Sequence, residues 1–221
     1  EQGWDVMMLA GIDSEAPWAR RLLGQLAADF KVYQGPQTVR IGASLSGGLE
    51  GFLGRRTRYF RRNLKRNIRR CGEQEIEFEK IPLDSPEQVA AAFERVMAVE
   101  NHSWKGLAGT GVNEGAMRDF YRLMLPRLAR RGAARLIMAS QEGEDVGFIF
   151  GGIRRDTYRG LQFSFKDDLR PIGLGNVLQY EALKVLVDEG IEVYDLGSDI
   201  DYKRLWGRPY LTTTMFNLLR F

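Results

Sequence analysis

The chain of 221 residues has 44% hydrophobic and 28% charged residues, a composition typical of a folded globular protein with one large domain or two small ones. Its net charge is only +3. It carries one cysteine, Cys71, and one histidine, His102, which exclude an internal disulfide and leave a zinc site or a Ser-His-Asp triad barely possible. The lone cysteine favours a reducing, cytoplasmic location, and no apolar run approaches the ~18 residues that span a bilayer.

The first third of the chain predicts strands around one helix. Residues 4–12 form an apolar run that predicts a buried strand. Residues 17–30 predict an amphipathic helix capped by Ser14, because large apolar side chains recur every four residues: Trp18, Leu22, Leu26 and Phe30. Residues 31–44 predict one or two strands interrupted at Gly35-Pro36, and Gly47, Gly48 and Gly51 predict a loop. The sequence opens with Glu1 instead of Met, so we expect a trimmed start of a longer chain.

The most basic part of the chain follows, at residues 55–70. Nine cations occur there without an acid: Arg55, Arg56, Arg58, Arg61, Arg62, Lys65, Arg66, Arg69 and Arg70. Apolar residues at helical spacing predict a helix over 53–70 that lies on the body of the protein: Leu53, Phe60, Leu64 and Ile68. Its cationic outer face is either a solvated surface or a binding surface for phosphates, nucleic acid or an acidic polymer. Arg69 and Arg70 are expected to lower the pKa of Cys71.

The middle of the chain alternates helices with a run of strands. Residues 75–81 predict a strand, and Ser85-Pro86 predicts the start of a helix that leads into Glu100-Asn101-His102-Ser103-Trp104-Lys105-Gly106. Another helix is expected over 117–128, with a kink at Pro126. Residues 136–139, 146–153 and 158–165 predict three consecutive antiparallel strands.

A glycine turn then joins a strand to a helix, at Arg170-Pro171-Ile172-Gly173-Leu174-Gly175-Asn176. A helix ending at Gly190 and a strand over 191–196 follow it, and the last strand is expected over 212–219. Glycines at a helix start leave N–H groups open to a ligand's phosphates, although the same residues also make ordinary turns. The order of elements predicts an α+β fold with a mixed, mostly antiparallel sheet flanked by helices.

These residues resemble a known family. Arg170-x-x-Gly173-x-Gly175 matches the Arg/Gln-x-x-Gly-x-Gly/Ala turn of the GNAT superfamily of acyl-CoA-dependent acyltransferases. The finer resemblance is to its CelD-like branch, associated with polysaccharide biosynthesis, and to Fem-type peptidyltransferases. It rests on four features: the arginine-rich residues 58–70, Glu100-x-x-Ser103-Trp104-Lys105-Gly106, Gly190 followed by Tyr194-Asp195-Leu196-Gly197, and Tyr202-Lys203-x-x-Trp206-Gly207.

The resemblance implies a GNAT-like fold with two lobes. Residues 1–82 would be a partial N-terminal lobe that includes the basic helix 53–70, and residues 83–221 would be the complete C-terminal acyltransferase domain. It also implies acetyl-CoA or another acyl-CoA as donor, with no metal. The residues implied to hold the donor's pyrophosphate are Arg170, Gly173, Leu174, Gly175 and Asn176.

Candidate catalytic and acceptor-binding residues follow from the same motifs. The catalytic candidates are Glu100 and Asp199 as base, Tyr202 as acid, and Lys203 for stabilising negative charge. The substrate-binding candidates are Trp104, Lys105, Asp195 and Trp206. Each also has a structural interpretation: a helix-end carboxylate, turn or cap duty, core packing, or a surface lysine.

The function that the resemblance implies is direct acyl transfer from acyl-CoA, with an acetyl group as the expected acyl group, to an amine or hydroxyl of a sugar or cell-envelope precursor. One alternative is a Fem-type peptidyltransferase that uses aminoacyl-tRNA and holds RNA or another anionic ligand on the basic helix. A second alternative is a non-catalytic binding module that keeps the GNAT fold.

Overall fold

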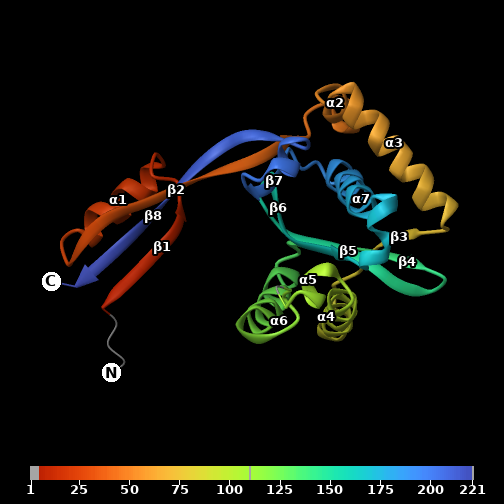
Figure 1. The fold of residues 1–221 in the computed structure, drawn as a ribbon. Helices are drawn as coiled ribbons and strands as arrows, with labels where there is room; N and C mark the ends of the chain where they lie inside the picture. The colour runs from red at the N-terminus through yellow and green to blue at the C-terminus, as the bar shows by residue number, and fades with distance from the viewer. Residues whose placement is uncertain (1–4, 110, 221) are drawn as a thin grey trace. The chain divides into compact units, whose positions relative to one another are not determined.

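The computed structural model describes residues 5–109 and 111–220, which divide into two compact units (Figure 1). One unit combines the start of the chain, up to Ala43, with its end, from Leu196. The other runs from Ser44 to Asp195. The division into a partial N-terminal lobe, residues 1–82, and a C-terminal domain, residues 83–221, stays a prediction.

The first unit is a three-stranded antiparallel sheet with a helix. Strand β8 (Arg208–Arg220) pairs with β1 (Val6–Ile12) along one edge and with β2 (Phe30–Ser44) along the other. Helix α1 (Pro17–Leu26) connects β1 to β2, and the short α8 (Asp201–Arg204) precedes β8. The predicted strands and helix of this part of the chain are therefore present, but the helix predicted over 17–30 ends at Leu26 and Phe30 begins β2.

Three local predictions in this unit were wrong. β1 is not buried, since Met8 is 68% exposed, because β1 is an edge strand that pairs only with β8 in the described chain. Ser14 does not cap α1, whose N-cap is Ala16. β2 is not interrupted at Gly35-Pro36, since a register shift between Gln34 and Gln37 absorbs the proline as a bulge.

The second unit is a sheet with helices on both faces. Its strands follow the order β7-β6-β5-β4-β3, and every adjacent pair is antiparallel except β6 with β7. The strands are β3 (Glu77–Lys80), β4 (Ala134–Gln141), β5 (Glu144–Arg154), β6 (Thr157–Phe165) and β7 (Val193–Ser198). The three consecutive antiparallel strands predicted from the sequence are confirmed as β4, β5 and β6.

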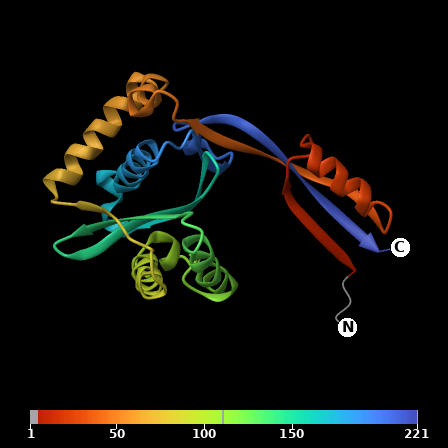
Figure 2. The ribbon, with the colours of Figure 1, turned by 180° about the vertical axis from the view of Figure 1, so that it is seen from behind.

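One face of this sheet carries α4 (Pro86–Asn101), α5 (Trp104–Leu107) and α6 (Gly115–Ala129), and the other carries α7 (Leu174–Asp188) (Figure 2). Alternate side chains of β4 enter the two cores: Leu136 and Met138 pack on the α4 side, whereas Ile137 and Ala139 pack on the α7 side. Helix α4 starts with a capping box in which Ser85 accepts the N–H of Gln88.

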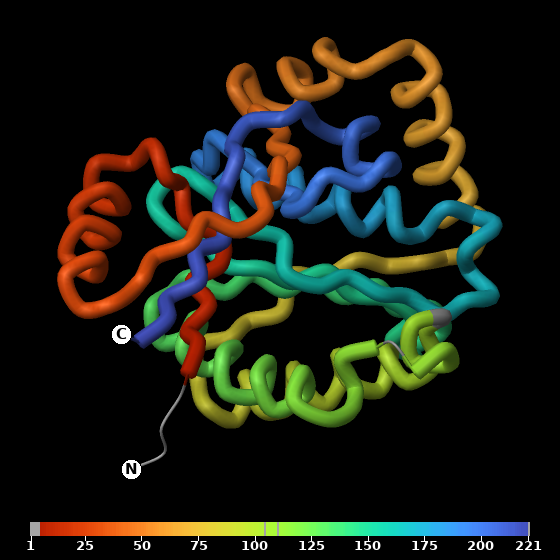
Figure 3. The backbone as a smooth tube through the Cα atoms, turned by 60° about the vertical axis from the view of Figure 1, so that its left-hand side comes forward, coloured from red at the N-terminus to blue at the C-terminus, as the bar shows by residue number. Residues whose placement is uncertain are grey.

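The basic segment forms α3 (Arg58–Glu73), which lies beside α7 (Figures 1 and 3). Its N-cap is Thr57, and its buried residues are Phe60, Leu64, Asn67 and Cys71. The predicted helix over 53–70 is present only from Arg58, because Leu53 belongs to the preceding helix and the chain leaves the helix at residues 55–57. Ile68 is 38% exposed and does not belong to the buried stripe. Gly47, Gly48 and Gly51 do not form a loop, because α2 (Gly48–Gly54) begins there with Gly47 as its N-cap at φ 75°.

Together the described residues give the predicted class, a mixed α+β fold with a mostly antiparallel sheet flanked by helices. None of the helices in the part of the chain that the structure describes is long and apolar enough to cross a membrane.

Candidate functional site

The candidate site lies where β6 leaves the sheet. Parallel pairing with β7 covers only Thr157 to Arg159 on β6, although the strand continues to Phe165. The N–H of Lys166 donates to the carbonyl of Val146 on β5. Because backbone groups alternate along a strand, Phe163 then presents its N–H and C=O to the opposite edge, away from β5. In the described chain, this edge has no strand partner beyond Arg159 until an isolated antiparallel bridge joins Lys166, just after β6, to Ser103.

Lys105 from α5 covers part of that edge. Its Nζ donates to the carbonyl oxygen of Phe163 at 2.6 Å and to Oε1 of Gln162 at 3.4 Å, and it lies 5.3 Å from the centre of the Phe163 ring. Burial lowers the pKa of Lys105, and the charge of Glu100 opposes that shift. The sequence placed Lys105 in a motif, and the structure puts its charge on the β6 edge.

The glycine turn follows directly. A 3-10 helix (Asp167–Ile172) ends at Gly173, the N-cap of α7, whose φ of 80° is a left-handed conformation that favours glycine. Gly175 is required for packing, because a Cβ there would lie 2.6 Å from Cε1 of Phe165. Leu174 and Gly175 are buried, whereas Gly173 and Asn176 are half-buried. The side chain of Arg170 is 58% exposed and pairs with Asp167 at 3.1 Å.

Helix α3 brings two polar side chains to this turn. The carboxamide of Asn67 lies so close to Gly173 that a Cβ on that glycine would be 2.3 Å from Asn67 Nδ2. Asn67 is only 4% exposed, and its carboxamide makes no hydrogen bond with the described residues. Arg70 donates from Nη1 to the carbonyl oxygen of Pro171 at 3.1 Å. Sequence reasoning missed Asn67, although a polar residue within the apolar stripe of Phe60, Leu64 and Cys71 was the available signal.

Glu100 is fully buried, so the structural interpretation of an exposed helix-end carboxylate is wrong. Its Oε1 accepts the N–H of Val112 at 3.1 Å, and its Oε2 accepts the hydroxyl of Ser103 at 3.2 Å. The Ser103 Oγ in turn accepts the N–H of Gly106 at 3.1 Å. Glu100 therefore ties the loop after α5 to the end of α4.

Asp195 lies in β7 with its side chain in an ion pair with Arg159, at 2.8 Å between Oδ1 and Nη1. The two residues are register partners in the parallel β6–β7 ladder. This pairing occupies the carboxylate that the sequence offered for substrate binding. The Trp104 side chain lies outside the described part of the structure.

The remaining candidates belong to the first unit. Asp199 accepts two hydrogen bonds from Arg204, both at 2.7 Å, which hold the pKa of Asp199 below its usual range. Burial raises the pKa of Tyr202, whose side chain remains 40% exposed, and Lys203 donates to the carbonyl of Ser198 at 3.2 Å. Trp206 is buried, at 1% exposure, as expected for packing.

One electrostatic expectation was wrong. Burial raises the pKa of Cys71 to about 11, and the charge of Glu181 adds to the increase. The neighbouring arginines do not lower it, because Cys71 faces the core between α3 and α7. A thiol with this pKa is almost entirely protonated at neutral pH.

The described residues gather no group of three or more His, Cys, Asp and Glu side chains that could hold a metal. What they do gather is an open strand edge, a left-handed glycine and a helix start, with Asn67 and Arg70 beside them. Helix starts bind anions because the first N–H groups have no partner within the helix. The arrangement can therefore hold an anionic group at the turn and an extended chain along β6.

Comparisons with known structures agree on this fold. L-PGS from Bacillus licheniformis shares 14% identity with a TM-score of 0.62, and the match covers 96% of this chain and 67% of that one. FemX shares 11% identity with a TM-score of 0.61, covering 95% and 71%. A conserved protein of unknown function from Bacteroides thetaiotaomicron shares 14% identity with a TM-score of 0.59, covering 97% and 69%. At these identities the similarity shows the fold alone.

No curated protein sequence matches the chain. The model of the acetyltransferase (GNAT) domain family matches residues 58–204, which is well over half of the sequence. The match includes α3, the β4–β6 strands, the glycine turn and α7. The chain belongs to the acetyltransferase (GNAT) domain family.

Proposed function

We propose that this acyltransferase uses acyl-CoA, with acetyl-CoA the simplest donor, and transfers the acyl group directly to an amine or hydroxyl of a sugar or cell-envelope precursor in the cytoplasm. The observation that carries the proposal is the left-handed Gly173 at the start of α7, with the unpartnered carboxamide of Asn67 against it. The four CelD-like motifs of the sequence support the choice of acceptor.

The donor would lie along two elements. Its pyrophosphate would meet the first N–H groups of α7, at Leu174 and Gly175, with Asn176 and the exposed Arg170 adding polar and cationic contacts. Its extended pantetheine arm would pair with the backbone edge of β6 beyond Arg159. Lys105, which already donates to the Phe163 carbonyl at that edge, would orient the arm or the acyl carbonyl.

In the chemical step the neutral acceptor attacks the thioester carbonyl and loses one proton to solvent, the carbon–sulfur bond breaks, and the departing thiolate takes up a proton. The sequence motif proposes Tyr202 as the proton donor and Lys203 for charge stabilisation, and both roles stay predictions from the motif. Asp199 is a weak base, because Arg204 lowers its pKa, and buried Glu100 serves to position the loop.

Calorimetry with acetyl-CoA, longer acyl-CoAs and nucleotide sugars tests the donor site. The decisive variant is Asn176→Glu, with Asn176→Gln as its size-matched control. A carboxylate in the first turn of a helix stabilises that helix but repels a bound phosphate. We expect acyl-CoA affinity to fall about tenfold or more for Asn176→Glu only, with no loss of thermal stability. Equal binding by the two variants, or no binding by the wild type, would contradict the acyl-CoA assignment.

A second candidate is a Fem-type transferase that uses aminoacyl-tRNA, and the exposed face of α3 favours it. Arg58, Arg62 and Lys65 are exposed and make no ion pair with the described residues, and they lie on one stripe of the helix. In contrast, Arg61 donates to the carbonyls of Leu53 and Arg56 and is needed by the fold.

Filter binding of tRNA at several salt concentrations tests this candidate. Charge reversal at Arg62 and Lys65 should reduce the salt dependence of binding by about 0.7 for each phosphate that these side chains no longer neutralise. If RNA affinity does not change with salt concentration, or does not change when both charges are reversed, the Fem-type candidate is wrong. If neither acyl-CoA nor tRNA binds, the remaining interpretation is a binding module without a donor site.

A further inference from the structure

Helix α6 exposes an apolar ridge that the proposed transferase does not use. Its inner face buries Tyr121 and Leu125 in the core. Its outer face carries three large apolar side chains spaced three residues apart: Met117, Phe120 and Leu123, which are 46%, 51% and 50% exposed. Residues three apart lie next to one another on a helix, so these side chains form a continuous ridge.

The same helix is strongly cationic. Residues 115–131 contain five arginines and a single acid, Asp119. Arg122 pairs with Asp119 at 3.4 Å, and Arg127 donates to the carbonyl oxygen of Leu123 at 2.9 Å. Three others make no ion pair with the described residues: Arg118, Arg130 and Arg131. An exposed apolar ridge bordered by arginines is typical of a helix that lies in a membrane interface.

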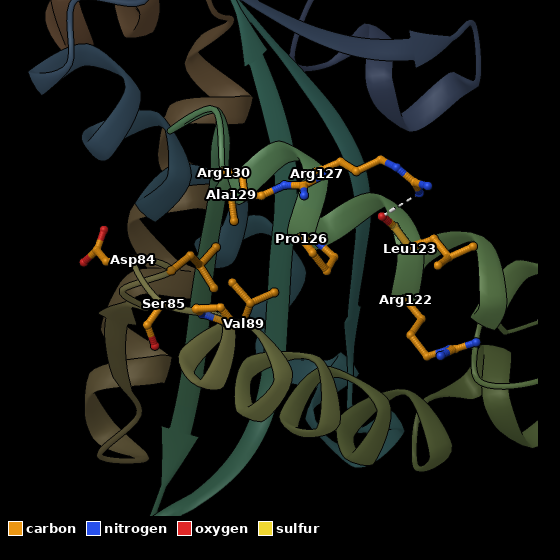
Figure 4. Close-up of a pocket in the computed structure, with 11 residues that line it drawn as sticks. Asp84, Ser85, Val89, Arg122, Leu123, Pro126, Arg127, Ala129 and Arg130 are labelled. Carbon is orange, nitrogen blue, oxygen red and sulfur yellow. Dashed lines mark hydrogen bonds between the residues drawn. The ribbon is translucent and has the colours of Figure 1, made fainter.

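A groove runs beside the ridge, between α6 and the start of α4 (Figure 4). Its volume is about 400 Å³, and its walls are largely apolar, with Val89 of α4 and Pro126 of α6 on facing sides. Three cations, Arg122, Arg127 and Arg130, also line it, together with one acid, Asp84. A second hollow of about 470 Å³ continues along α4 past Phe93. An apolar groove with cations at its border fits a chain that is apolar along its length and anionic at its head.

We propose that this surface, formed by Met117, Phe120, Leu123, Arg122, Arg127 and Arg130, docks on an anionic lipid bilayer. Phe120 and Leu123 enter the boundary between headgroups and acyl chains, and the arginines contact lipid phosphates. The groove between α4 and α6 accepts part of one acyl chain. The proposal does not depend on the donor used at the glycine turn.

A comparison with the other cationic helix, α3, indicates that α6 suits a lipid surface better than a nucleic acid. The exposed face of α3 has a comparable number of cations, but its large apolar side chains, Phe60 and Leu64, face the core. Only Tyr59 and Ile68 are exposed among its large apolar residues. Charge alone suits a phosphodiester backbone, whereas charge with a protruding apolar ridge suits a bilayer.

Co-sedimentation with vesicles of phosphatidylglycerol and phosphatidylcholine tests the proposal on the full chain. The wild type should bind anionic vesicles, keep part of that binding at high salt through the apolar ridge, and not bind pure phosphatidylcholine. Arg122→Glu with Arg130→Glu should weaken binding by more than about a hundredfold, because four charge units change near the surface. Phe120→Ser with Leu123→Ser should remove the salt-resistant part.

The matched control is Arg62→Glu with Lys65→Glu on α3, which changes the net charge by the same amount on another surface. If vesicle affinity depends on contacts at α6 and not on net charge, this control should bind vesicles within about threefold of the wild type. Equal losses in both charge variants would show attraction by net charge alone and would overturn the proposal, as would failure of the wild type to bind anionic vesicles. All six altered side chains are exposed, so thermal unfolding should confirm an intact fold in each variant.

Discussion

The polar side chains on the two faces of β6 differ in whether they form hydrogen bonds within the protein. On the α4–α5 side, Glu100, Ser103 and Lys105 form hydrogen bonds with the backbone groups of Val112, Gly106 and Phe163. On the α7 side, the carboxamide of Asn67 has no hydrogen-bond partner in the described chain, and it lies against the start of a helix.

The difference separates groups that are bonded within the fold from a group that is available to a ligand. The carboxamide of Asn67 makes no hydrogen bond within the described chain, so it can bind water or a ligand at the turn. A satisfied network contributes stability and leaves no site for a ligand. This is why buried Glu100, although acidic and close to β6, is a poor general base, and why Asn67 supports the proposed donor site.

The largest expected effect is on stability, from Glu100→Ala. The substitution leaves the N–H of Val112 without its acceptor inside the protein, whereas the hydroxyl of Ser103 keeps the backbone carbonyl of residue 100 as its acceptor at 2.9 Å. An unsatisfied buried group costs about 1–3 kcal/mol, so the free energy of unfolding should fall by roughly 2 kcal/mol. Urea titration measures it. A loss below about 1 kcal/mol would mean that the network does not hold the loop.

Asn67→Leu should leave stability nearly unchanged and weaken acyl-CoA binding. Because the carboxamide makes no hydrogen bond, replacing it with an apolar group of similar size should leave the free energy of unfolding unchanged or raise it by about 1 kcal/mol. Acyl-CoA affinity should fall by about tenfold, the usual cost of one hydrogen bond to a charged group.

Urea titration and calorimetry on the same preparations separate these effects. Asn63→Leu, one turn earlier on α3, is the control for adding an apolar residue to the helix. If Asn67→Leu destabilised the chain as much as Glu100→Ala, or bound acyl-CoA as the wild type does, the distinction between the two faces of β6 would fail.

The sequence predicted the elements around β6 better than the chemistry on either side. Period-two and helical patterns located β4, β5, β6 and α7, because those patterns depend on which face of each element is buried. They could not show that β1 is exposed, since burial depends on how many strands surround it. They also missed α2, because the glycines that predict a loop here start a helix through the left-handed Gly47.

The site residues depended on interactions that local patterns do not contain. Glu100 meets Val112 twelve residues away, and Asn67 meets Gly173 more than a hundred residues away. Arg204, five residues after Asp199, was close enough to notice, but only coordinates show that it binds both carboxylate oxygens. The motif correctly located the helix start, whereas the partners that tune each group became visible only in three dimensions.

The smallest effect concerns Lys105 and its response to pH. Burial lowers the pKa of Lys105 in the folded chain from its ordinary value of 10.5. Between the two pKa values the unfolded chain binds more protons, so stability rises with pH there. The contribution is complete above 10.5 and is lost as pH falls through the folded value. Relative to Lys105→Met, the wild type should therefore gain stability as the pH rises towards 10.5 in urea titrations, a comparison that cancels the titration of every other lysine.

Lys65→Met on the exposed face of α3 controls for the removal of one lysine charge from the chain. A wild-type advantage over Lys105→Met that shrinks as the pH rises would show that the β6 edge holds the ammonium form more favourably than water does. Lys105 would then be a permanent cation at the β6 edge, available to a bound ligand like the carboxamide of Asn67.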